Sequence, residues 1–264
     1  MIKLIASDID GTLVNDEKQF APDFFHILKE LNKRNIKFVA ASGRSKYSLE
    51  EIFKPYENEL LYVSDNGAFV SDNQTEYCTH KLNKDDVAAV VEMLLELDEI
   101  QIVLCGKYKS YLINFQEQFL EQVKVYYNVF EIVDDYKSIE DDFLKIAVYD
   151  SKGSSKHSHP KVKDNLPEGL CAIATSAVWM DIMDCSVNKG RGVEALQKVF
   201  DISPDETMVF GDYFNDIEMF KKAKYSFAME NACDEVKKHC NYCAKNNNDF
   251  GVTEKIKEMV LKNN

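Results

Sequence analysis

The sequence predicts an α/β protein with a Rossmann-like parallel sheet, helices on both faces of that sheet, and an inserted α+β cap domain. Short runs that are apolar on both faces alternate with helical segments in residues 1–80 and again in 186–264. Such runs are typical of strands buried between two helical layers. Residues 81–185 contain strand candidates joined by short turns, which indicates antiparallel pairing. At 264 residues the chain exceeds one typical domain, so a second unit is expected.

The first region contains three strand candidates and one clear helix. The strands are predicted at the apolar runs Ile2–Ser7, Ile36–Ala41 and Leu60–Ser64. Between the first two, apolar residues recur with helical spacing, and Pro22 suits a first helical turn. These helical positions are Phe24, Phe25, Ile27, Leu28 and Leu31.

The middle region has a different pattern. Asn83 is a candidate N-cap for a helix with one apolar stripe, formed by Val87, Val90, Val91, Leu94 and Leu95. Two hairpins are predicted, one from Gln101–Cys105 with Tyr111–Asn114 and one from Cys171–Thr175 with Val178–Met183. Phe143–Tyr149 is a further strand candidate. The hairpins indicate a separate α+β unit.

The last region returns to alternating strands and helices. Helices are predicted at Gly192–Phe200, Asp216–Ala223 and Val252–Leu261, and strands at Thr207–Phe210 and Tyr225–Ala228. We therefore expect residues 1–80 and 186–264 to form one core, with residues 81–185 as its cap.

Charge and hydropathy exclude several classes of protein. The net charge of −13 argues against a nucleic-acid or anionic-membrane partner, which would require a basic face. No apolar stretch is long enough to cross a bilayer, and the N-terminus has no apolar leader segment. We expect a cytoplasmic protein, either a monomer or a small homo-oligomer, that acts on a small molecule.

The seven cysteines are an odd number in a chain without a secretory leader. They are expected to be reduced and mostly buried structural thiols. Cys240 and Cys243 form a C-x-x-C pair, but a zinc site would need a second well-spaced pair.

Four polar motifs follow predicted strands or begin predicted helices. They are Asp8-Ile9-Asp10-Gly11-Thr12, Ser42-Gly43-Arg44, Asn188-Lys189-Gly190 and Gly211-Asp212-Tyr213-Phe214-Asn215-Asp216. Taken singly, each has an ordinary explanation, such as a serine N-cap, a solvated lysine or acids at a helix start. Together they supply a carboxylate nucleophile, a hydroxyl with free N–H groups, a lysine and a crowded acidic loop. Phosphoryl transfer requires these parts, and a hard cation such as Mg²⁺ would relieve the repulsion between the acids.

These motifs resemble those of the haloacid-dehalogenase-like hydrolase superfamily, in its Cof-type phosphatase branch. The D-x-D-G-T motif matches Asp8–Thr12, the serine motif matches Ser42, the lysine motif matches Lys189, and G-D-x-x-N-D matches Gly211–Asp216. The gap from Asp8 to Ser42 is 34 positions, too few for an inserted domain, whereas Ser42 to Lys189 spans 147. A cap in the second gap resembles the Cof-type phosphatases and differs from the β-phosphoglucomutase-like relatives.

The resemblance implies a role for each residue. Asp8 is the nucleophile that forms an aspartyl phosphate, and Asp10 is the general acid and base. Mg²⁺ is held by Asp8, the backbone oxygen of Asp10 and Asp212, while Asp216 orients the metal shell. The phosphate is held by the backbone N–H groups of Ile9 and Gly43 and by the side chains of Ser42, Lys189 and Asn215. The implied substrate is a small phosphorylated metabolite, with sugar phosphates the usual case.

Three alternatives stay open at this point. A phosphomutase uses the same chemistry and returns the phosphoryl group to a sugar. A receiver-like signalling domain also phosphorylates an aspartate, but it would not need a cap. A non-catalytic phosphate-binding sensor would bind phosphate and release none.

Overall fold

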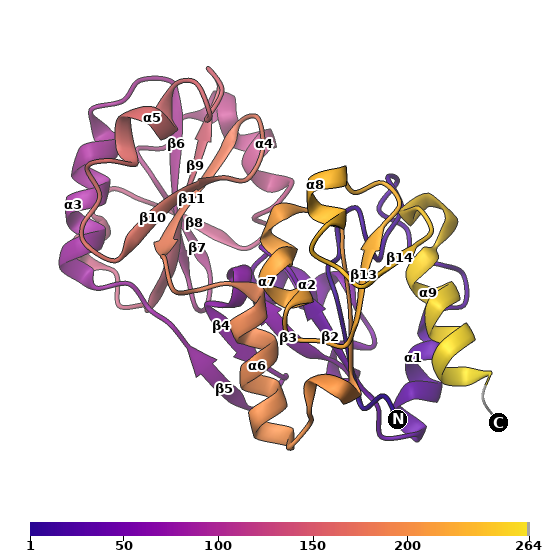
Figure 1. Cartoon of the computed structure of the whole chain (residues 1–264). Helices are drawn as coiled ribbons and strands as arrows, with labels where there is room; N and C mark the ends of the chain where they lie inside the picture. Colours follow the sequence, from indigo (N-terminus) through magenta and orange to yellow (C-terminus); the bar gives the residue numbers. More distant parts are fainter. Residues whose placement is uncertain (263–264) are drawn as a thin grey trace. The chain divides into compact units, whose positions relative to one another are not determined.

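The computed structural model describes residues 1–262, which divide into two compact units (Figure 1). The first unit comprises Met1–Gly43, Leu49–Cys78 and the chain from Asn188 onward. The second unit comprises Arg44–Ser48 and Thr79–Val187. No helix within residues 1–262 combines the length and apolar character that crossing a bilayer requires.

The first unit is built on an eight-stranded sheet with the strand order β14-β13-β12-β1-β2-β3-β4-β5. From β14 to β3 the strands are parallel, and β4 is antiparallel to β3. The strands are β1 (Leu4–Ser7), β2 (Lys37–Ala41), β3 (Leu61–Ser64), β4 (Phe69–Ser71), β5 (Glu76–Thr79), β12 (Thr207–Gly211), β13 (Tyr225–Met229) and β14 (Tyr242–Ala244). The predicted α/β class is confirmed.

Helices cover both faces of this sheet because its strands are apolar on both sides. Along β1, Ile5 packs into one apolar cluster, whereas Leu4 and Ala6 pack into the other. The first face carries α1 (Phe24–Lys33), α2 (Lys46–Ile52) and α9 (Gly251–Ile256), and the second carries α6 (Lys189–Phe200), α7 (Ile217–Phe220) and α8 (Asp234–Lys237). A π-helical turn, Lys257–Leu261, extends α9.

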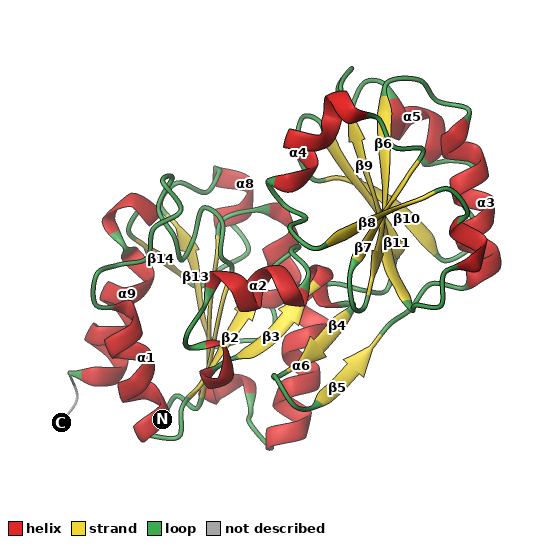
Figure 2. Cartoon of the chain, turned by 180° about the vertical axis from the view of Figure 1, so that it is seen from behind, coloured by secondary structure: helices red, strands yellow, loops and turns green. Residues whose placement is uncertain are grey.

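The second unit contains a six-stranded, mainly antiparallel sheet with the strand order β10-β11-β9-β6-β7-β8 (Figure 2). Its strands are β6 (Ile100–Gly106), β7 (Ser110–Ile113), β8 (Phe130–Val133), β9 (Phe143–Asp150), β10 (Leu170–Ala174) and β11 (Trp179–Asp184). Both predicted hairpins are confirmed, as β6–β7 and β10–β11. Helices α3 (Lys84–Leu95) and α5 (Ser158–Val162) pack on one face, and α4 (Leu120–Lys124) packs on the other.

The cysteine prediction is wrong in two respects. Cys171 and Cys185 form a disulfide with a Cα–Cα distance of 5.1 Å, because the β10–β11 pairing brings the start of one strand beside the end of the other. The thiols of Cys233 and Cys243 are exposed rather than buried. Cysteine number and cellular compartment predict reduced thiols, whereas the predicted hairpin of β10 and β11 brings Cys171 close to Cys185.

The helix expected at Gly192 begins three residues earlier, at Lys189. Asn188 caps it, and its side chain accepts a hydrogen bond from the Arg191 N–H at 2.9 Å. Gly190 in the first turn lies against α7, so close that a Cβ there would stand 2.3 Å from the Glu218 carbonyl oxygen. Gly190 is therefore required for helix packing, although glycine has a low helix propensity.

The Gly190→Ala variant is expected to lower the free energy of unfolding by about 2 kcal/mol, since the new methyl group would overlap backbone that cannot move aside locally. Urea unfolding measures this change. Lys198→Ala, on the exposed face of the same helix, serves as the control and is expected to shift stability by less than about 0.5 kcal/mol. Equal stability of the two variants would contradict the packing explanation.

Candidate active site

The first motif continues directly from the central strand β1. The Asp8 N–H donates to the Phe210 carbonyl oxygen at 3.0 Å, which extends the β1–β12 ladder by one residue. The chain then turns around the Ile9 carbonyl oxygen, which accepts from the Leu13 N–H at 3.0 Å. This turn leaves the side chain of Asp8 buried at the carboxyl end of the sheet. Open α/β sheets bind ligands at that edge.

Gly11 is the residue that makes the turn possible. Its φ of +79° lies in the left-handed region that favours glycine. A Cβ at this position would stand 2.6 Å from Oδ2 of Asp212. The glycine thus lets the loop after β1 approach the loop after β12.

The loop after β12 carries two acids with different surroundings. Asp216 is fully buried, and its Oδ2 accepts hydrogen bonds from the N–H groups of Asp212 at 3.0 Å and Tyr213 at 3.1 Å. Asp212 is less buried, and its Oδ1 accepts from the Thr12 hydroxyl at 2.7 Å. Asp216 therefore shapes the loop, while Thr12 orients the carboxylate of Asp212.

Lys189, the first residue of α6, contacts acids from both of these loops. Its Nζ lies 2.5 Å from Oδ1 of Asp8 and 2.7 Å from Oδ1 of Asp216, and the lysine is only 1% exposed. Burial opposes the charge of Lys189, but the carboxylates of Asp216 and Asp8 outweigh it and raise its pKa above the usual value. The lysine is therefore held as a cation between two acids.

Three carboxylates gather around this lysine. One oxygen from each of Asp8, Asp212 and Asp216 lies within 4.8 Å of the others; we call these three residues the acid cluster. Burial, together with the neighbouring acids, raises the pKa of Asp8 well above its ordinary value despite the opposing charge of Lys189. Burial also raises the pKa of Asp212, to about 6. Such a cluster of hard oxygen donors favours a divalent cation.

The predicted phosphate-binding residues are brought to neighbouring strand ends. Ser42 follows β2, is 3% exposed, and pairs through its backbone with Val63 and Asn66 at 2.9 Å each. Asn66 is buried with a φ of 56°, and its Oδ1 accepts from the Asn215 side chain at 3.1 Å. A Cβ on Gly43 would stand 3.2 Å from the same Asn66 oxygen. Asn66 thus connects the serine motif with the last motif.

Asp10 does not belong to the acid cluster formed by the described residues. Its Oδ1 lies 2.7 Å from Nζ of Lys18, in the turn that follows the first motif. The motifs in the sequence gave no signal for Lys18 or for Thr12 as a partner of Asp212. The side chain of Asn231 donates to the Gly11 carbonyl oxygen at 2.8 Å. Each of these contacts depends on the loop conformation.

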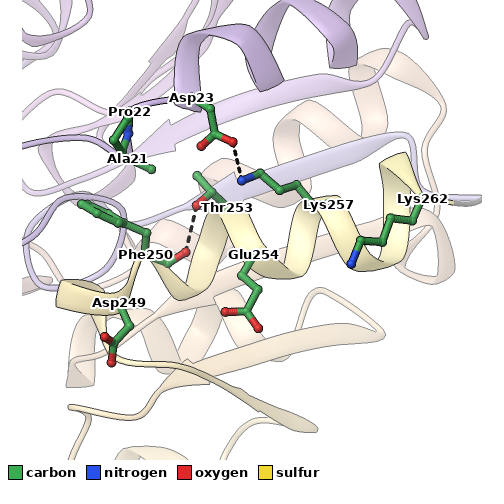
Figure 3. A pocket seen from close by; sticks show the side chains of 9 residues that line it. All are labelled: Ala21, Pro22, Asp23, Asp249, Phe250, Thr253, Glu254, Lys257 and Lys262. Atoms are coloured by element: carbon green, nitrogen blue, oxygen red, sulfur yellow. Dashed lines mark hydrogen bonds and ion pairs between the residues drawn. The ribbon is translucent and has the colours of Figure 1, made fainter.

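A cavity of about 320 Å³ lies elsewhere in the first unit, between the start of α1 and α9 (Figure 3). An ion pair between Asp23 and Lys257 crosses it, and the Thr253 hydroxyl donates to the Phe250 carbonyl oxygen at 2.8 Å. Its described lining residues are Ala21, Pro22, Asp23, Asp249, Phe250, Thr253, Glu254, Lys257 and Lys262. None of the predicted site residues is among them, so this cavity is distinct from the candidate site at the strand ends.

Comparison with known proteins gives consistent matches over the whole chain. A model of the haloacid dehalogenase-like hydrolases matches residues 5–256. A 5-amino-6-(5-phospho-D-ribitylamino)uracil phosphatase of Escherichia coli is 36% identical over 99% of this chain and 97% of its own length. A Bacillus subtilis phosphatase with the same named substrate is 25% identical over 98% of this chain and 96% of its own length.

A solved structure also matches this chain over almost its whole length. The protein SMU.1108c from Streptococcus mutans UA159 superimposes with a TM-score of 0.88 and 30% identity. The match covers 99% of this chain and all of that chain.

Titration of the acid cluster offers a test of its geometry. Because the pKa of Asp212 is raised from its ordinary 3.8 to about 6, the folded protein binds a proton that the unfolded chain has already lost. In EDTA, the deprotonation of Asp212 in the folded protein therefore lowers the free energy of unfolding as pH rises from about 4 to about 6. Above that range this loss of stability is complete. Asp212→Asn is therefore expected to raise the melting temperature at about pH 7.5, with a gain that shrinks towards pH 5. A difference between variant and wild type that stays constant across this range would contradict the crowding of the acids.

Proposed function

Since this chain belongs to the Cof-type haloacid dehalogenase-like hydrolases and is a phosphatase, we propose that it hydrolyses small phosphomonoesters with Mg²⁺ through an aspartyl-phosphate intermediate. Sugar phosphates are the substrates we favour. The observation that carries the proposal is the placement of Asp8, which is buried at the strand end and held by Lys189 at 2.5 Å. A carboxylate fixed in this way can serve as a nucleophile.

In the first step, an oxygen of Asp8 forms a bond to phosphorus while the bond from phosphorus to the ester oxygen breaks. Asp10, protonated on the oxygen that Lys18 does not contact, gives this proton to the ester oxygen, so the leaving group departs as an alcohol. In the second step, water attacks the phosphorus, its proton passes to Asp10, and the bond to Asp8 breaks. Inorganic phosphate is released and both acids return to their starting states. Acid–base help of this kind contributes roughly 10²–10⁴-fold to rates.

Lys189 reduces the repulsion between the anionic nucleophile and the anionic phosphate. The remaining phosphate oxygens are assigned to Ser42, the N–H groups of Gly43 and Ile9, and the amide of Asn215. The contact of Asn215 with Asn66 supports this assignment because it orients the amide from a second strand end. The whole set provides donors around the phosphate, as phosphoryl transfer requires.

The acid cluster fits Mg²⁺ because it offers hard oxygen donors in a compact, largely buried group. We assign the metal to Asp8, Asp212 and the backbone oxygen of Asp10. Both oxygens of Asp216 already accept hydrogen bonds from Lys189 and the loop N–H groups, which supports an orienting role for this residue. When bound, the cation offsets the negative charge of the phosphate and the carboxylates.

The relatives suggest where to begin with substrates. Two of them are named as phosphatases of 5-amino-6-(5-phospho-D-ribitylamino)uracil, in which the phosphate is carried on a sugar-alcohol chain. This name is compatible with the sugar-phosphate class and makes a phosphorylated ribityl compound a specific candidate for this chain.

The proposal is tested by measuring phosphate release from a panel of phosphomonoesters. The panel contains sugar phosphates, nucleotides, flavin mononucleotide, pyridoxal phosphate and the ribitylaminouracil phosphate. We expect release with Mg²⁺, loss of release in EDTA, and recovery when Mg²⁺ is restored. Isomerisation of a sugar phosphate that depends on a bisphosphate would favour a phosphomutase instead, and binding without release from any ester would favour a sensor.

The Asp8→Asn variant is expected to lose turnover while keeping its fold, because the amide is nearly isosteric with the carboxylate but is a poor nucleophile. Phosphate release and circular dichroism measure the two properties. Residual activity above a few per cent of wild type would exclude Asp8 as the nucleophile. Asp98→Asn, an exposed acid in the second unit, provides a matched control expected to keep full activity.

A further inference from the structure

Lys18 forms an ion pair with Asp10, the acid that the proposed mechanism uses for proton transfer. Its Nζ lies 2.7 Å from Oδ1 of Asp10. The side chain of Asp10 is 32% exposed, whereas that of Asp8 is 10% exposed. The Asp10 carboxylate therefore points to a more open part of the loop than the nucleophile does.

The backbone around Lys18 is held in a tight turn. The Asn15 N–H donates to the Gln19 carbonyl oxygen at 3.0 Å, and the Lys18 N–H donates to the Asn15 carbonyl oxygen at 2.9 Å. The side chain of Asn15 accepts from the Gln19 N–H at 2.8 Å. Lys18 itself has a φ of 63°, a conformation that residues with a side chain seldom adopt. Such a conformation persists only where the surrounding contacts impose it.

Two asparagines from far along the chain fix this turn. The Asp16 N–H donates to Oδ1 of Asn248, and the two Asp16 carboxylate oxygens accept from the side-chain amides of Asn247 and Asn248, each at 3.0 Å. Asn247 also donates to the Val14 carbonyl oxygen at 3.2 Å. The turn that presents Lys18 is thus tied to residues that follow β14.

A gain in folding stability is a weak explanation for the ion pair between Lys18 and Asp10. Exposed ion pairs contribute little to folding because water and salt screen them and because two long side chains lose freedom. The pair does restrict the rotamers of Asp10, and proton transfer depends on that restriction because the acid must reach one particular oxygen.

We propose that Lys18 is a positioning residue that holds the Asp10 carboxyl group on the leaving-group side of the phosphate, apart from the acid cluster. This proposal rests on the proposed function, in which Asp10 protonates the ester oxygen. Without Lys18 the Asp10 side chain samples other rotamers, and fewer of them reach that oxygen.

The leaving group provides a specific test of positioning. An alkoxide is a strong base and departs slowly unless it receives a proton, whereas 4-nitrophenolate is a weak base and departs without one. The ratio kcat/KM reports the steps up to the first irreversible one, which includes breaking the ester bond. A misplaced Asp10 therefore lowers kcat/KM for an alkyl phosphate and leaves it nearly unchanged for 4-nitrophenyl phosphate.

We expect Lys18→Met to lower kcat/KM about tenfold for the best sugar phosphate of the panel, a fraction of the full effect of acid–base catalysis. The same variant is expected to change kcat/KM for 4-nitrophenyl phosphate by less than about twofold. Lys18→Arg keeps the charge and the reach, so it is expected to restore most of the loss. Lys33→Met is the matched control, since Lys33 forms an exposed ion pair of the same length with Glu30.

Two results would overturn the proposal. Equal losses with both esters would show that Lys18 attracts substrate through its charge, and unchanged values with both would show that the ion pair has no role in turnover.

Asp10→Asn separates these results from a failure of the proposed function. If that variant shows no leaving-group-dependent loss, proton transfer by Asp10 is wrong; if it does and Lys18→Met does not, only the positioning role is wrong. In the Asp10→Asn background, Lys18→Met is expected to add no further difference between the esters.

Discussion

One buried lysine between two buried carboxylates is the interaction on which the site depends. Lys189 contacts Asp8 from the end of β1 and Asp216 from the loop after β12. Removing the lysine would leave two buried carboxylates without a cation, which costs about 3–5 kcal/mol. The lysine therefore ties the start of α6 to two loops, and Asp8 cannot shift without disturbing all three.

The packing of α6 follows from that requirement. To bring Nζ to both acids, the first turn of the helix must lie deep against its neighbours. Glycines at 190 and 192 permit this, because a Cβ at Gly192 would stand 2.4 Å from the Val63 side chain in β3. The chemistry at the strand ends and the packing beneath it are consequently parts of one arrangement.

Much of this architecture could be predicted from the sequence, and the limits of prediction have physical causes. Strands apolar on both faces, such as Ile2–Ser7, can be recognised because burial between two layers leaves no room for polar residues. Polar motifs directly after such strands must lie at one edge of a parallel sheet, which brings Asp8 and Asp212 to the same edge. By contrast, β14 is only three residues long and carries the exposed residues Tyr242 and Cys243, so its composition gives little signal.

Contacts made by loop side chains were beyond prediction for a different reason. The pair of Lys18 with Asp10 requires a left-handed residue in a tight turn, and the contacts of Asp16 join positions 232 residues apart. The disulfide between Cys171 and Cys185 depends on strand pairing rather than on cysteine count. In each case the residue type is ordinary, and only the three-dimensional path of the chain gives it a partner.

The central position of β1 has a consequence for biosynthesis. This strand pairs with β2 on one side and with β12, some two hundred residues later, on the other. During translation the first motif leaves the ribosome early. Strand β12, which pairs with one side of β1, is made only after the whole second unit. Non-local pairing of this kind is slow to form and leaves an unpaired strand edge exposed meanwhile. We therefore expect the buried surroundings of Asp8 to remain unformed in the nascent chain until β12 has emerged.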